Sequence, residues 1–203
     1  MRTYLLEFLT ELFDSKMKTP EDILRFWFSD RVSKQWYKSS DAFDAEIRRE
    51  FEQTALKLAT QQAVSARPHQ WEKKSPEAHL ALIISLDQFP RNMYRHTPAA
   101  YAWDDFALRC AKRMIARKTD VLLSQDQRDF AYKPFMHSEN LVDQEESVRL
   151  CDARLNNNNT LKFAKNHRDI IARFGRFPHR NVVLGRETLP EEQAFLDSGG
   201  FSG

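Results

Sequence analysis

The sequence predicts an all-α protein of about nine helices arranged as antiparallel hairpins. Apolar residues recur three or four positions apart from one end of the chain to the other, which is the spacing of a helix with one buried face. Only five of the 203 residues are glycine, and β-branched residues are sparse outside short runs, which favours helices over sheets. No segment alternates apolar and polar residues as a half-buried strand does.

The N-terminal half is expected to hold four helices. A leucine-rich face at the start of the chain marks the first, and Thr19 with Pro20 opens the second in N-cap and first-turn positions. A long apolar stripe marks the third, from about Asp41 to Gln62. The polar segment "VSARPHQWEKKS" (64–75) is expected to be a loop. The next helix, "SPEAHLALIISLDQF" (75–89), is apolar nearly all round, as a helix surrounded by others is.

The second half is expected to hold five helices, each opened by a serine or threonine: Thr97, Ser124, Ser138, Thr160 and Thr188. Gln127 and Glu191 complete capping boxes with Ser124 and Thr188, and Gly175 ends the helix that starts at Thr160. No linker divides the chain. We therefore expect one tetratricopeptide-like helical domain over residues 19–203, preceded by a helical extension, residues 1–18.

Composition and charge exclude several functional classes. The formal net charge is +2, so the chain lacks the overall field of a non-specific nucleic-acid binder. No segment approaches the roughly 18 apolar residues of a membrane span, and acidic residues interrupt the first apolar runs, unlike a signal peptide. Cys110 and Cys151 lie within helical patterns and are expected to be buried thiols in the cytoplasm. No metal-ligand or cofactor motif occurs, so no metal and no cofactor are expected.

Two segments echo each other: "DQFPRN" (87–92) and "RFGRFPHRN" (173–181). Each places Phe-Pro after an apolar helix and then Arg and Asn, which predicts two equivalent corners of the helical array. One interpretation is architectural, with the arginine and asparagine bonded to the last carbonyls of the preceding helix. The other is functional, because the second copy lies in a stretch (165–186) with six basic residues and one acid.

Arginine suits fork-shaped contacts with carboxylate or phosphate, so the corners predict an anion-binding pocket. The candidate ligand-binding residues are Arg91, Asn92, His137, Arg173, Arg176, His179, Arg180 and Asn181. Those that follow Gly175 leave the helix and are the better placed to reach a ligand.

A second candidate cluster is "PFMHSEN" (134–140). His137 is expected just before a helix start, where free backbone amides bind anions, and Glu139 in its first turn. Plain capping is the alternative. For acid–base chemistry the candidates are His137, Glu139, His167 and His179, although His167 shares an apolar helix face and also fits a core position.

The strings "ILRFWFSD", "LALIISLDQFPRN", "PFMHSE" and "HRDIIARFGRFPHRN" closely resemble the signatures of the domain-of-unknown-function 924 family of bacterial proteins. The resemblance extends from about Asp22 to Phe201. It implies an all-helical, tetratricopeptide-like fold and no established activity. Two departures stand out: the segment up to about Lys18 resembles an extension, and "RKTD" (117–120) lacks a glycine expected before the aspartate.

Three functions stay open. The first is a binding module whose pocket holds an anionic small molecule or an acidic peptide. The second is an enzyme in which histidine and a carboxylate act as acid and base on an anionic substrate. The third and weakest is RNA binding, which would use Trp36, Tyr37 and Trp71 as exposed aromatic side chains. The oligomeric state and the ligand do not follow from the sequence.

Overall fold

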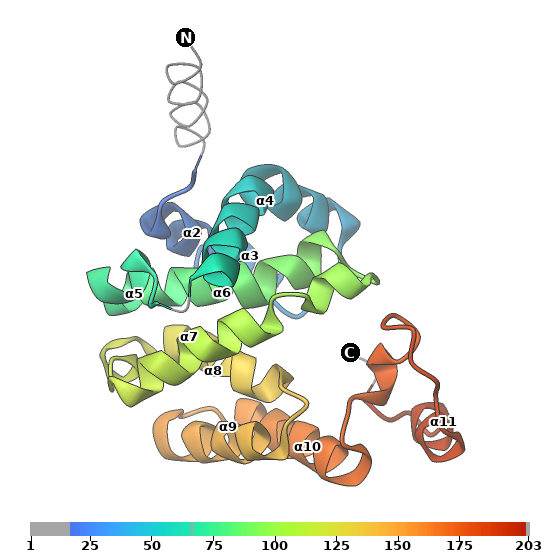
Figure 1. Cartoon of the computed structure of the whole chain (residues 1–203). Coiled ribbons are helices and arrows are strands. Elements are labelled where there is room, and N and C mark those ends of the chain that lie inside the picture. The colour runs from blue at the N-terminus through green and yellow to red at the C-terminus, as the bar shows by residue number, and fades with distance from the viewer. Residues whose placement is uncertain (1–16, 66, 202–203) are drawn as a thin grey trace.

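Helix α6 (Pro76–Met93) runs through the middle of the molecule and organises the other helices around it (Figure 1). The structure is a computed structural model that describes residues 17–65 and 67–201. The expected first helix, with Leu5, Leu9 and Leu12, lies outside the described residues.

Within the described residues the chain forms ten α-helices and three 3-10 turns, with no strand. The elements are α2 (Pro20–Trp27), α3 (Asp30–Ser33), α4 (Asp41–Val64), α5 (Gln70–Lys74), α6, η1 (Pro98–Tyr101), α7 (Asp104–Ala116), η2 (Asp120–Leu122), α8 (Gln125–His137), α9 (Leu141–Arg154), α10 (Asn158–Phe174), η3 (Pro178–Arg180) and α11 (Pro190–Asp197). The all-α prediction is confirmed. All eight helices expected in this part of the chain are present, and α3 and α5 add to them.

Helix α5 corrects the expected loop at 64–75. His69 ends the preceding loop, and its Nδ1 accepts a hydrogen bond from the Trp71 N–H, while Glu72 accepts one from the His69 N–H. These two bonds satisfy free amides at a helix start, which allows a one-turn helix to form in a polar segment. The side chain of Trp71, in this helix, is buried.

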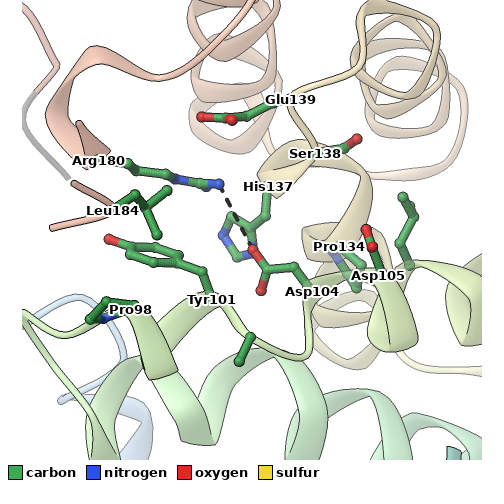
Figure 2. A pocket seen from close by; sticks show the side chains of 12 residues that line it. Pro98, Tyr101, Asp104, Asp105, Pro134, His137, Ser138, Glu139, Arg180 and Leu184 are labelled. Carbon is green, nitrogen blue, oxygen red and sulfur yellow. Dashed lines mark ion pairs between the residues drawn. The ribbon is translucent and has the colours of Figure 1, made fainter. Parts of the chain in front are cut away.

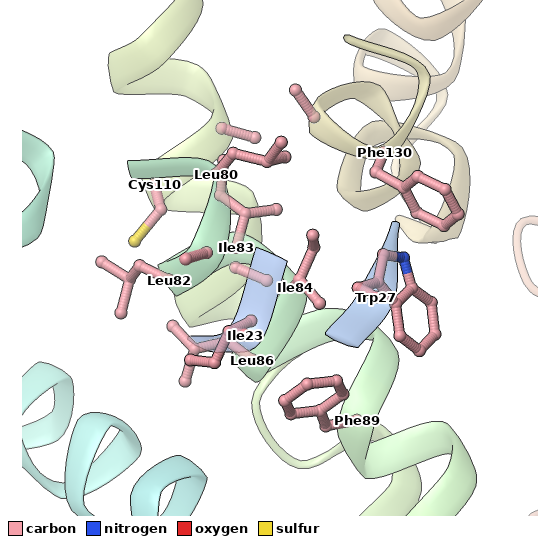
Figure 3. Packing of buried hydrophobic residues seen from close by; sticks show 14 of the residues in the cluster. Ile23, Trp27, Leu80, Leu82, Ile83, Ile84, Leu86, Phe89, Cys110 and Phe130 are labelled. Carbon is pink, nitrogen blue, oxygen red and sulfur yellow. The ribbon is translucent and has the colours of Figure 1, made fainter. Parts of the chain in front are cut away.

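The core is built on α6 because that helix packs against α2, α4, α5, α7 and α8. Its side chains are therefore buried on every face: Leu80, Leu82, Ile83, Ile84, Leu86 and Phe89 are each at most 1% exposed. Figure 3 shows Trp27 of α2 and Phe130 of α8 on one side of them and Cys110 on the other. Burial of each such side chain contributes about 1.5–3 kcal/mol, so the apolar sequence of α6 directly determines its central place.

Four expected helix starts were wrong. Helix α10 begins at Asn158 with Asn157 as its N-cap, before Thr160, and α11 begins at Pro190 with Leu189, not Thr188, in the N-cap position. The other two shifts affect the site. Helix α8 continues through His137, Ser138 forms its C-cap, and Asn140 caps α9 by accepting from the Val142 N–H. The helix expected from Thr97 breaks at Trp103, whose backbone is not helical, so that η1 ends at Tyr101 and α7 begins at Asp104.

The two Phe-Pro segments are not equivalent corners. Pro90 lies inside α6, which continues to Met93 although the proline nitrogen cannot donate a helical hydrogen bond. In the second copy α10 ends at Phe174, Gly175 adopts a left-handed φ of 69°, and Pro178 begins η3. Only the second copy is a corner.

A smaller apolar cluster holds the C-terminal segment against α10. Ile170, Ile171 and Phe177 are buried, with Phe195 and Phe201 packed on them. Cys110 and Cys151 are free and buried in the main core, as expected. None of the described helices is long and apolar enough to cross a membrane.

Candidate functional site

A pocket of about 310 Å³ lies where η1, the start of α7, the end of α8 and η3 meet (Figure 2). Tyr101, Asp104, His137, Glu139 and Arg180 contribute its polar lining, and Leu108 and Leu184 contribute apolar surface. These residues come from three separate stretches of the chain, 98–108, 134–139 and 180–184, so the pocket exists only in the folded chain.

Local sequence explains how the acidic wall forms. Because the helix breaks at Trp103, Asp104 and Asp105 occupy the first turn of α7 and line the pocket. Acidic side chains are favoured in a first turn by the positive end of the helix dipole. The tight 3-10 turn before them brings Tyr101 to the same opening.

His137 is held by a buried carboxylate. Its Nδ1 lies 2.8 Å from Oδ1 of Asp87, which is 0% exposed within α6. Burial lowers the pKa of His137 to about 4, with the positive charge of Arg91 as the next cause, although Asp87 opposes both. The imidazole is therefore neutral at pH 7. Burial opposes ionisation of Asp87, but the nearby His137 and Arg91 outweigh it and hold the Asp87 pKa below its usual range.

Arg91 connects the buried carboxylate to the pocket wall. Its guanidinium donates two hydrogen bonds of 2.8 Å to the carboxylate of Asp104 and lies 3.4 Å from Asp87. Burial disfavours its charge, but Asp104 and Asp87 outweigh burial and raise the Arg91 pKa. The Arg91 guanidinium thus interacts with both carboxylates and holds Asp104 beside the opening of the pocket.

Arg180 is the basic group that lines the pocket. The residue is 6% exposed, and its guanidinium lies 4.8 Å from the ring centre of Tyr101 and 4.5 Å from that of Phe177. Its ion pair with Asp104 is long, at 3.8 Å, and its Nε has no hydrogen-bond partner among the described residues. Burial, together with Arg91, lowers its pKa.

Glu139 closes the opposite side of the pocket, after the end of α8. Arg186 donates hydrogen bonds of 2.7 and 3.0 Å to its two oxygens, and the Phe177 N–H donates a third of 2.8 Å. Burial raises the pKa of a carboxyl, but these donors outweigh it and the Glu139 pKa lies below its usual value. Glu139 is therefore ionised, and its hydrogen bonds connect the end of α8 to the second Phe-Pro segment.

The structure brings together three of the sequence-predicted residues, His137, Glu139 and Arg180, with Arg91 directly behind Asp104. The expected position of His137 before a helix start is wrong, since it is the last residue of α8 and the next helix, α9, begins only at Leu141.

Four of the candidates contact other parts of the molecule and do not line the pocket. Asn92 donates to Asp44 of α4, whereas Arg176 and Asn181 both donate to Glu192 of α11. Arg173 lies over the rings of Phe174 and Phe195. These contacts are structural, but they differ from the architectural interpretation. Among the described residues, none of the hydrogen bonds of these four side chains reaches the last carbonyls of the preceding helix, and their acceptors are carboxylates, apart from the Glu187 carbonyl oxygen that accepts from Arg176.

His167 and His179 belong to the small aromatic cluster at the C-terminal end. Both rings contact Phe177 and Phe201, and the Nδ1 of His167 bonds to the Phe163 carbonyl oxygen. Burial lowers their pKa values to about 4 for His167 and about 3 for His179. Neither histidine lines the pocket, so the core interpretation of His167 agrees with its position.

The basic stretch 165–186 is partly neutralised, by two acids from elsewhere and one within the stretch. Arg176 forms an ion pair with Glu192, and Arg186 forms one with Glu139. Within the stretch, Arg168 pairs with its neighbour Asp169. Of the aromatic side chains expected for RNA, Trp71 is buried and the Trp36 indole N–H donates to the Trp27 carbonyl. Tyr37 is exposed.

Sequence reasoning missed Asp87, Tyr101, Asp104 and Arg186. Asp87 carried the strongest signal, because it is an acid in a helix that is apolar on every face, and such a residue needs a buried partner. Tyr101 and Asp104 carried none, because their place depends on the helix break at Trp103. No group of three or more His, Cys, Asp or Glu side chains that could hold a metal occurs among the described residues.

Comparison with known proteins shows the family of this chain but no activity. The sequence model of the family described as "Bacterial protein of unknown function (DUF924)" matches residues 23–200. A solved structure, that of the protein of unknown function ATU0120 from Agrobacterium tumefaciens, is 37% identical, covers 89% of this chain and 97% of its own, and superposes with a TM-score of 0.80. No curated protein matches this chain.

Proposed function

This chain belongs to the DUF924 family of bacterial proteins of unknown function, and since that family assigns no activity, we propose from the pocket itself that the protein binds a small carboxylate. Arg180 is the anion-binding group, and Tyr101 and Phe177 orient its guanidinium. His137 and the apolar side chains of the lining complete the contacts with the ligand.

The observation that carries this proposal is the state of Arg180. Arg91, Arg176 and Arg186 each donate paired hydrogen bonds to a carboxylate. Arg180 is more buried than any of them and makes no side-chain hydrogen bond within the described residues. A buried charge without hydrogen bonds is costly in free energy, so such a group is retained where a ligand completes it. A carboxylate matches the two-pronged geometry of the guanidinium.

Size and charge narrow the ligand class. A volume of about 310 Å³ suits a small molecule and is at the lower end for ligand pockets, which disfavours a long acidic peptide. The carboxylates of Asp104, Asp105 and Glu139 also line the pocket and repel a multiply charged phosphate. A ligand with one negative charge fits this wall best.

Two broader expectations belong to the same proposal. The sequential pairing of α6 with α7, α8 with α9 and α9 with α10 supports a tetratricopeptide-like arrangement. Two free, buried thiols support a reducing, cytoplasmic location.

The test is an NMR titration with butyrate and, separately, with inorganic phosphate. Wild-type protein is expected to bind butyrate more tightly than phosphate, with shifts of the His137 ring signals. Arg180→Met should weaken butyrate binding about 10–100-fold, the value of a charged hydrogen-bond pair.

Arg173→Met is the matched control, because it removes one positive charge from the same stretch without touching the pocket. Equal weakening in both variants would overturn the proposal, since binding would then reflect overall charge. Absence of binding to the wild type would do the same.

A further inference from the structure

We propose that this pocket is also a catalytic site that hydrolyses a small carboxylic ester or amide. His137 acts as the general base toward water, Asp87 positions its ring, and Arg180 binds the oxyanion. The inference rests on the proposed function, because the small carboxylate that Arg180 binds is the acid that hydrolysis releases.

The geometry of Asp87 and His137 provides the base. The carboxylate of Asp87 lies 2.8 Å from Nδ1, so the proton of the neutral ring resides on Nδ1 and Nε2 carries the lone pair. Nε2 has no hydrogen-bond partner among the described residues, and His137 lines the pocket. The same arrangement of a buried carboxylate and an outward lone pair is what a general base requires.

Burial of the ring, with the positive charge of Arg91 as the next cause, keeps it unprotonated before reaction, although Asp87 and Asp104 oppose both. The charged groups that surround His137 are Asp87 and Arg91 from α6, Asp104 from α7, Glu139 after α8 and Arg180 from η3. Because its pKa is about 4, the ring is ready to accept a proton throughout the neutral range. Asp87 stabilises the imidazolium that forms during the reaction.

Water is the nucleophile that the site can supply. Within the described chain no serine, threonine or cysteine side chain bonds to Nε2. Ser138, the nearest in sequence, donates instead to Asp143, and both cysteines are buried in the main core. The acidic lining favours a neutral acyl substrate, which gains a single negative charge at the atom nearest Arg180.

The step balances with water as the co-substrate. The water oxygen bonds to the acyl carbon, its proton moves to Nε2, and the carbonyl electron pair moves onto oxygen, where Arg180 binds the resulting charge. The oxyanion then reforms the carbonyl, the C–O or C–N bond breaks, and the imidazolium returns its proton to the leaving alcohol or amine. The released acid ionises and remains as a carboxylate on Arg180.

The experiment measures hydrolysis of p-nitrophenyl butyrate by the full chain. We expect the rate to fall about 100-fold or more in His137→Gln, the usual value of a general base, and about 100-fold in Arg180→Met. His96→Asn is the control for hydrolysis by surface histidines, because His96 is exposed, lies outside the pocket and has a left-handed backbone that asparagine tolerates. It should retain the wild-type rate.

Asp87→Asn tests positioning. Removal of the carboxylate charge lowers the pKa of His137, so the acid limb of the pH–rate profile should move to lower pH while the plateau falls. A structural role alone would leave the limb in place. If this variant does not fold, the His137 and Arg180 variants still decide the proposal.

The two proposals fail differently. Butyrate binding by His137→Gln and by wild type, without hydrolysis above the buffer rate, would overturn catalysis and retain the carboxylate site. Hydrolysis that is equal in wild type and His137→Gln would also overturn catalysis. Loss of butyrate binding in wild type would overturn both.

Discussion

Arg180 illustrates at the scale of one residue how burial changes the meaning of a charge. As part of a basic stretch it is one arginine among several, and an exposed charge of that kind is worth little. In the folded chain it is 6% exposed and lies against two aromatic rings. The other arginines near it, Arg91, Arg176 and Arg186, form close ion pairs with carboxylates. The sequence predicts the same ligand-binding role for Arg176 and Arg180, but of the two only Arg180 lines the pocket.

Lys118 is a residue whose backbone, rather than its side chain, is informative. It lies after α7 with a φ of 57°, in the left-handed region that favours glycine. The segment "RKTD" is also where the family resemblance leads one to expect a glycine. The structure explains that expectation, because the turn into η2 needs this conformation whichever residue occupies it.

Lys118→Gly should therefore stabilise the protein by about 0.5–1 kcal/mol in urea unfolding, through relief of the left-handed strain. Lys118→Ala is the matched control, since it removes the same charge and retains a Cβ atom. Alanine should give no gain. Equal effects of the two substitutions would show that charge, and not backbone conformation, decides the stability at this position.

At the scale of elements, the site depends on two proline-containing helices. Asp87 lies three residues before Pro90 in α6, and His137 lies three residues after Pro134 in α8. Direct packing of α6 on α8 brings the two side chains together. Because both helices belong to the main core, the histidine and its carboxylate are held by rigid elements, whereas Arg180 comes from a short turn.

Helix α11 is attached through Phe195 in the small apolar cluster and through one buried carboxylate. Glu192 is 1% exposed and accepts from Arg176, Asn181 and the Leu189 N–H. Its pKa is lowered to about 2, first by the hydrogen bond from Arg176. The capping box expected between Thr188 and Glu191 is therefore wrong by one position, because Glu192 caps the helix at Leu189.

Glu192→Gln should destabilise the attachment of α11 by about 2 kcal/mol, because Arg176 and Asn181 lose a charged acceptor in a buried place. We expect earlier cleavage within residues 182–201 in limited proteolysis, while the unfolding of the main core is little changed. Glu191→Gln is the control, since Glu191 is exposed. If both variants are cleaved at the same rate, Glu192 is not the tie that holds this helix.

At the scale of the whole molecule, charge is balanced between distant segments. The basic stretch 165–186 meets Glu139 and Glu192 in space, so the second corner carries far less net charge than its sequence implies. Buried histidines form the other global feature. The pKa is lowered by burial to about 4 in His79, His137 and His167, and to about 3 in His179.

These four histidines predict a loss of stability in mild acid. Their folded pKa values lie below the unfolded value of about 6.5, so the unfolded state binds more protons as the pH falls from 6.5 toward 4. The free energy of unfolding should be lower at pH 5.5 than at pH 7 by about 1 kcal/mol for each histidine. Asp87 and Glu192 stay ionised over this range because their pKa values are lowered.

Urea unfolding at the two pH values measures the effect. An unfolding free energy that is equal or higher at pH 5.5 would contradict the burial of neutral histidines. A second measurement separates the sites: His79→Gln should reduce the pH dependence by about a quarter.

Much of the fold could be predicted from local chemistry. The N-caps Thr19 and Ser75, the capping box of Ser124 with Gln127, and Gly175 at the end of α10 all lie where expected, since caps depend on residues within one helical turn. The starts of α9 and α10 were misplaced because Asn140 and Asn157 cap these helices in place of the nearby Ser138 and Thr160. The start of α7 was misplaced because the helix breaks at Trp103, whose side chain makes no cap hydrogen bond and gives no local signal. Helix α11 begins one residue later than expected, after Leu189. The apolar residues on nearly every face of α6 correctly predicted that it lies at the centre of the molecule.

The site could be predicted only in part, for a physical reason. Patterns along the chain predict an all-α fold, a central α6 and a set of polar residues that includes His137, Glu139 and Arg180. The packing of distant helices brings Asp87 to His137 across fifty positions and Arg91 to Asp104. It also pairs Arg176 and Arg186 closely with carboxylates and leaves Arg180 with one long ion pair to Asp104. Helix caps and apolar faces arise from neighbours in the chain, whereas the partner of a charged group is set by helices that pack far from it in sequence.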